Sequence, residues 1–152
     1  MIAWRARYGL RTPINTVVRA LNPGGAKLGI RGSYHPGFQQ LHAEVENVMG
    51  KTSHGVISFK GLSGESEYNP KVSQTVWLSH NEGVESHYWE EQMSEELPST
   101  NRDRMGTPVE DNELMANTVV STMAALLFTE TNDRELANSK ALSLWEAYCK
   151  DQ

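Results

Sequence analysis

The chain has 152 residues, of which 38% are hydrophobic and 22% charged, with a net charge of −5 and one cysteine. This composition excludes wholesale disorder, a disulfide-stapled scaffold and a cysteine-based metal cluster. The length suits one globular domain over 1–152 that buries about two thirds of its unfolded surface. The longest apolar run, MAALLF at 123–128, is too short to cross a bilayer. We therefore expect a cytoplasmic protein with no membrane partner.

The charge is distributed unevenly along the chain. Residues 1–43 contain six basic residues and no acidic one, whereas residues 44–152 hold all 19 acidic residues and the other eight basic ones. Such a division marks a surface for an anionic partner, or two halves that neutralise each other within the fold or across an oligomer. Both interpretations stay open at this point.

The first predicted element is a helix over 12–21. A hydroxyl N-cap followed by proline begins it, and Asn22-Pro23-Gly24-Gly25 ends it. Its apolar residues recur on one face, at Ile14, Val17, Val18 and Leu21. A strand is expected next, over 26–32.

A second helix is predicted over 37–49, with Gly50 placed to cap its C-terminus. We expect its apolar stripe to pack into the core, His42 to lie within the stripe, buried and hydrogen-bonded, and Glu44 to point outward. The stripe consists of Phe38, Leu41, Val45, Val48 and Met49.

The middle of the chain is expected to form strands over 54–60 and 73–79, joined by a long hairpin loop over 61–71. Residues 82–96 carry six glutamates, which favours a solvated helix ended by Leu97-Pro98. The polar stretch 98–112 is expected to be a loop.

The C-terminal region predicts a helical hairpin, broken at 129–132, in which Asn132 and Glu135 form a capping box for the second helix. The face predicted to be buried on the first helix carries Ala116, Val119, Val120, Met123 and Leu127. The face predicted on the second helix carries Ala137, Ala141, Leu144, Trp145 and Tyr148. The order of elements predicts an α+β fold: a small antiparallel or mixed sheet covered on one face by helices, with this hairpin at the C-terminus.

A metal site is one candidate for chemistry. The triplet His42-Ala43-Glu44 matches half of the zinc-deaminase signature, but the P-C-x-x-C half is missing, which excludes that activity. His42 and Glu46 are spaced i, i+4 on a helix, so with flanking His35 or His54 they are candidate ligands of a metal-dependent hydrolase. The competing interpretation is that His42 is a core residue. No phosphate-loop or dinucleotide-binding motif is present, and we expect no cofactor.

The basic N-terminal region is the strongest binding candidate. Arginines supply forked donors for phosphates or carboxylates, and aromatic rings supply stacking faces. The candidate partner-binding residues are Trp4, Arg5, Arg7, Tyr8, Arg11 and Arg31.

Three functions follow from these features. The first is a non-enzymatic binding or assembly module, a homo-oligomer that uses the basic N-terminal region, residues 1–43, and an acidic surface from residues 44–152. The second is a protein that binds nucleotides or nucleic acid through the N-terminal arginines. The third is the metal-dependent hydrolase centred on His42 and Glu46.

Overall fold

A computed structural model describes residues 20–50, 52, 54–62, 66–80, 82–93 and 112–151, together with the isolated positions 7 and 17. Its strands are β1 (Gly29–Ser33), β2 (Val56–Lys60), β3 (Gln74–His80) and β4 (Gly83–Trp89). Its helices are α3 (Phe38–Met49), α4 (Glu113–Thr131) and α5 (Arg134–Lys150). Most of the helix predicted over 12–21 and of the loop predicted over 98–112 lies outside the described residues.

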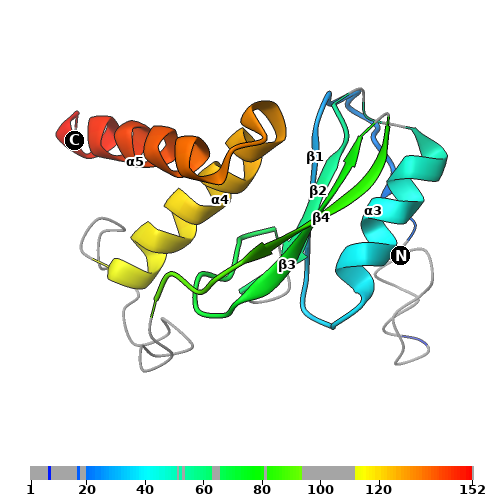
Figure 1. Cartoon of the computed structure of the whole chain (residues 1–152), viewed down its shortest axis with the longest axis horizontal. Coiled ribbons are helices and arrows are strands. Elements are labelled where there is room, and N and C mark those ends of the chain that lie inside the picture. The colour runs from blue at the N-terminus through cyan, green and yellow to red at the C-terminus, as the bar shows by residue number, and fades with distance from the viewer. Residues whose placement is uncertain are drawn as a thin grey trace.

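The four strands form one mixed sheet in the order β1-β2-β3-β4. β1 and β2 are parallel, and the other two pairings are antiparallel. Helix α3 lies against one face of the sheet, and the hairpin of α4 and α5 lies on the other side (Figure 1). The predicted α+β fold with a C-terminal helical hairpin is confirmed. The prediction that helices cover only one face is wrong.

Helix α3 is the crossover between the two parallel strands, and glycines bound it at both ends. Gly37 precedes it with φ 82°, and Gly50 follows with φ 53° and donates its N–H to the carbonyl of Glu46. Left-handed backbone of this kind favours glycine, so the predicted cap at Gly50 is confirmed. A parallel pair needs a crossover of this length, which explains why a helix separates β1 from β2.

The predicted helix over 82–96 is wrong in its first half, because Gly83–Trp89 is strand β4. This strand pairs with β3 in continuous register from Gln74↔Trp89 to His80↔Gly83. Side chains of a strand alternate between faces, so His87 and Trp89 point to the core while Tyr88 points away. The glutamates in and beside β4 are compatible with a strand because β4 is an edge strand.

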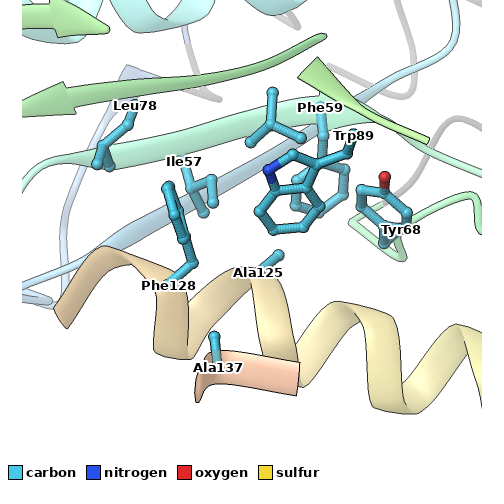
Figure 2. Packing of buried hydrophobic residues seen from close by; sticks show 9 residues of the cluster. Ile57, Phe59, Tyr68, Leu78, Trp89, Ala125, Phe128 and Ala137 are labelled. Atoms are coloured by element: carbon cyan, nitrogen blue, oxygen red, sulfur yellow. The ribbon is translucent and has the colours of Figure 1, made fainter. Parts of the chain in front are cut away.

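The main core lies between the sheet and α4 (Figure 2). Trp89 stands between two rings, with centroids 5.3 Å from Phe128 and 5.6 Å from Tyr68. The guanidinium of Arg134 covers the Trp89 ring at 5.1 Å. Aromatic pairs at these distances add specific geometry to the area they bury, so Trp89 joins the sheet, α4 and the start of α5.

The buried face of α4 differs from the predicted one and consists of Leu114, Thr118, Ser121, Ala124, Ala125 and Phe128. Two polar residues of this face can be buried because their hydroxyls are hydrogen-bonded. The Thr118 hydroxyl donates to the carbonyl of Leu114, and the Ser121 hydroxyl donates to the side chain of Gln92. The small residues Ser121, Ala124 and Ala125 share this face with the larger Leu114 and Phe128, while Val119 and Met123 are half-buried.

The second helix of the hairpin begins one residue later than predicted. Asp133 is its N-cap and accepts from the N–H of Leu136 at 3.0 Å, while Asn132, with φ 48°, is the C-cap of α4. Of the predicted buried face of α5, only Ala137 and Ala141 are buried, and Leu144 and Tyr148 are exposed.

Trp89→Ala should lower the free energy of unfolding by about 3–5 kcal/mol, because it leaves a cavity among Phe128, Tyr68 and Arg134. Urea denaturation followed by circular dichroism measures this change. The control is Tyr88→Ala on the same strand, where a side chain that is 67% exposed should cost less than about 1 kcal/mol. Equal effects of the two substitutions would contradict the described packing.

Candidate functional site

The two faces of the sheet have different chemistry. The row Ile30–Ile57–Leu78 faces α4 and belongs to the apolar core. The next row, Arg31–Ser58–Trp77, faces α3 and is largely polar. A helix that covers the second face therefore meets a charge and hydroxyl groups, and it packs well only if it presents polar groups in return.

Helix α3 does present its polar side to the sheet. Its buried residues are Gln39, His42, Ala43 and Glu46. The apolar residues that were predicted to be buried are turned to solvent instead: Phe38, Leu41, Val48 and Met49 are exposed, and Val45 is half-buried. The predicted orientation of the stripe is wrong, whereas the predicted burial of His42 and exposure of Glu44 are confirmed.

The Glu46 carboxylate holds α3 in this orientation. Its Oε1 accepts two hydrogen bonds of 2.7 Å from Thr52, one from the backbone N–H and one from the hydroxyl. Its Oε2 lies 4.0 Å from Nη2 of Arg31, an ion pair without a direct hydrogen bond. Glu46 is only 3% exposed, and a buried carboxylate is stable only when it is paired and hydrogen-bonded.

Arg31 is positioned by the strands around it. Its Nη1 donates to the carbonyl of Ile30, and the Ser58 hydroxyl donates to the carbonyl of Arg31 itself at 3.1 Å. Of the other predicted partner-binding residues, Arg7 is exposed. Trp4, Arg5, Tyr8 and Arg11 lie outside the described residues.

The four predicted metal candidates are spread over this region. His42 and Glu46 share the buried side of α3, but the oxygens of Glu46 are engaged by Thr52 and Arg31. His35 contacts the rings of Tyr34 and Phe38, and His54 lies in an exposed turn where its N–H donates to the carbonyl of Lys27. Within the described ranges no three His, Cys, Asp or Glu side chains gather in a way that could hold a metal ion.

The exposed side of α3 is an apolar surface, which we call the α3 stripe: Phe38, Leu41, Val45, Val48 and Met49. Val48 is 85% exposed. Polar residues that are also exposed flank the stripe, among them Gln40, Glu44 and Asn47. A single exposed apolar residue is ordinary, but a row that runs the length of a helix is typical of an interaction surface.

A second polar group lies on the β3–β4 hairpin. Glu85 Oε1 is 3.0 Å from His80 Nε2, and Oε2 is 3.4 Å from His87 Nε2. The N–H of Glu82 donates to His80 Nδ1, so His80 has its proton on Nε2 and donates it to Glu85. The His80 hydrogen bond, with a further contribution from His87, holds the pKa of Glu85 below its ordinary value.

The fold and site define a small α+β protein with a two-faced sheet and an exposed apolar helix face. No family model matches the chain, and no curated protein is significantly similar to it. Among the residues that the structure describes, no helix combines the length and apolar content needed to span a bilayer.

Glu46→Ala should lower the free energy of unfolding by about 3 kcal/mol, because it leaves the Thr52 donors and the Arg31 guanidinium without this acceptor. Chemical denaturation measures the change. Glu44→Ala, on the exposed side of the same helix, should cost less than about 1 kcal/mol. A small effect at both positions would show that the carboxylate does not fix α3.

The pKa of Glu85 should rise toward its ordinary value in His80→Ala, because the main hydrogen bond that lowers it is lost. Carboxyl carbon NMR titration measures this, with His54→Ala as a control that leaves Glu85 unchanged. A lowered folded-state pKa stabilises the protein above the ordinary value of 4.5. The stability difference between wild type and Glu85→Gln should therefore be full at neutral pH and vanish as the pH falls through the folded-state pKa. A difference that persists well below the folded-state pKa of Glu85 would contradict this account.

Proposed function

We propose that this protein is a non-enzymatic assembly module that forms a homo-oligomer, and that the α3 stripe is its self-association surface. The observation that carries the proposal is the orientation of α3, whose polar side is buried and whose apolar side is exposed. The single cysteine, Cys149, favours a reducing compartment, so we place the assembly in the cytoplasm.

Exposure of the α3 stripe is unfavourable, because each Å² of apolar surface removed from water is worth about 25 cal/mol. The stripe runs along a helix of 12 residues, which corresponds to a length of about 18 Å. A surface of this shape suits a second amphipathic helix laid against it. The orientation of α3 leaves the stripe exposed, which supports a surface that a partner covers.

The partner that we propose is the N-terminal segment 12–21 of a second copy. Its sequence places Ile14, Val17, Val18 and Leu21 at helical spacing. Val17 and Leu21 are both exposed, so each has apolar surface to bury against a partner.

Charge supports the same pairing. Arg11 directly precedes the segment and Arg19 lies within it, and the segment has no acidic residue. Helix α3 has Glu44 on its exposed side and contains no lysine or arginine. Opposite charges at the edge of an apolar contact favour the correct partner and orientation.

A further acidic surface is available to the basic residues before the segment. Four exposed carboxylates lie along the edge strand β4 and just beyond its ends: Glu82, Glu85, Glu90 and Glu91. This surface supports the wider proposal that the basic N-terminal region of one copy, residues 1–43, contacts the acidic region of another.

Val48→Asp should weaken self-association about 30-fold or more, because it places a charge in an apolar contact worth about 2 kcal/mol. Sedimentation equilibrium over a range of protein concentrations measures the dissociation constant. Asn47→Asp is the matched control: it adds the same charge at the neighbouring exposed position and should leave association nearly unchanged.

Ile14→Asp tests the proposed partner of the stripe and should weaken association as Val48→Asp does. A wild-type chain that stays monomeric at all concentrations would overturn the proposed assembly. An effect of Val48→Asp without one of Ile14→Asp would keep the α3 stripe as the interface but remove the N-terminal segment as its partner.

A further inference from the structure

The carboxyl ends of β1 and β2 meet at the start of α3. The two strands are parallel and in register, so Ser33 and Lys60 lie side by side at their ends. The turn 34–37 leads from β1 directly into the first turn of α3. In sheets with parallel strands, ligands bind outside the carboxyl ends, beside the N-terminus of the crossover helix.

The first turn of α3 is open to an anion. Gly37 is its N-cap and offers no side-chain acceptor, and no acidic residue occupies the first turn. A Cβ atom built on Gly37 would meet no other atom within 4 Å, so the space beside the turn is free. The N–H groups of a first helical turn have no intrahelical acceptor and favour negative charge.

A buried hydroxyl stands at the end of β1, just before this turn. Ser33 is on the α3 side of the sheet, two residues after Arg31, and its carbonyl accepts from the side chain of Gln39 in the first turn of α3. Ser33 is 4% exposed, and its Oγ has no hydrogen-bond partner among the described residues. A buried hydroxyl without a partner is rare, and a bound acceptor would satisfy it.

Aromatic and basic side chains surround the same point. Lys60 Nζ lies 5.8 Å from the centroid of the Tyr34 ring. The rings of Tyr34, His35 and Phe38 follow one another at centroid distances of 5.4 and 6.3 Å. Tyr34 is 59% exposed, so its ring is accessible for stacking. A cation beside an exposed aromatic ring suits a ligand with both a phosphate and a base.

We propose that the first turn of α3, with Ser33, Tyr34 and Lys60, binds a nucleoside phosphate. The phosphate accepts from the free N–H groups of the turn, from the Ser33 hydroxyl and from Lys60, and the base stacks on Tyr34. This site goes beyond the proposed assembly, adjoins the α3 stripe at Phe38 and uses none of the N-terminal arginines. A free nucleotide and a single nucleic-acid strand supply the same chemistry, and the test separates them.

The experiment is an NMR titration of ¹⁵N-labelled full-length chain with adenosine monophosphate, with inorganic phosphate and with a single-stranded oligoadenylate. The expected result is that all three shift the amides of residues 33–35, 37–40 and Lys60. A mononucleotide that binds as tightly as the oligonucleotide would identify a nucleotide site, and a much tighter oligonucleotide would identify a single-strand site. Either result supports the proposal.

Two variants test the roles of the side chains. Lys60→Gln should weaken binding of all three probes about tenfold, since it removes a charged donor to phosphate. Tyr34→Ala should weaken the two adenine probes about tenfold and leave inorganic phosphate unchanged. Lys140→Gln, an exposed lysine on α5, is the matched control and should bind as wild type does.

The proposal is overturned if adenosine monophosphate causes no shifts at millimolar concentration, or if the shifts map away from residues 33–40. It is also overturned if Lys60→Gln and Lys140→Gln bind alike. Heteronuclear spectra of each variant verify that it is folded, so a loss of binding is not mistaken for a loss of structure.

Discussion

The carboxylate of Glu46 determines how α3 sits on the sheet. With two hydrogen bonds from Thr52 and an ion pair to Arg31, it has these partners only while the polar side of the helix faces inward. Rotating α3 to bury its apolar stripe would move the carboxylate into solvent and take it away from Arg31 on the polar face of the sheet. The penalty for breaking a buried ion pair is several kcal/mol, comparable to the gain from burying two or three apolar side chains. The polar side of α3 thus packs against the sheet, and the apolar side is left exposed.

The two faces of the sheet differ in polarity, and this difference determines which helix covers each face. The apolar face, with Ile57, Phe59 and Leu78, is closed by α4 and contains the aromatic core around Trp89. The other face carries Arg31 and Ser58, and α3 presents Gln39, His42 and Glu46 to it. Both proposed surfaces follow from this arrangement. The α3 stripe is exposed because of the orientation, and the start of α3 lies over Ser33 and Lys60 because the crossover joins two parallel strands.

The sequence predicted where helices and strands lie better than which side of each is buried. Helical spacing and Gly50 located α3, and β-rich composition located β2 and β3, because these are local properties. The orientation of α3 depends on the strand face beneath it, which no local pattern contains. A signal was nevertheless present: Gln39, His42 and Glu46 form a second, polar row at helical spacing. In β4 the number of glutamates favours a helix, whereas the alternation of Glu85, His87 and Trp89 with Tyr88 indicates the strand that is observed. The contact of Glu85 with His80 exists only because β3 and β4 pair, so it could not be found without the strand.

The central claim is that α3 buries its polar side and offers its apolar side to another copy, and thiol reactivity tests it most directly. In a Cys149→Ser background, cysteine is introduced at Leu41 on the stripe or at Ala43 on the buried side, and its reaction with a maleimide is followed over a range of protein concentrations. We predict that the thiol at position 41 reacts freely in dilute protein and becomes protected as concentration rises. The thiol at position 43 should be protected throughout. A reactive thiol at 43 together with protection at 41 at every dilution would show that α3 faces the other way and would contradict the account.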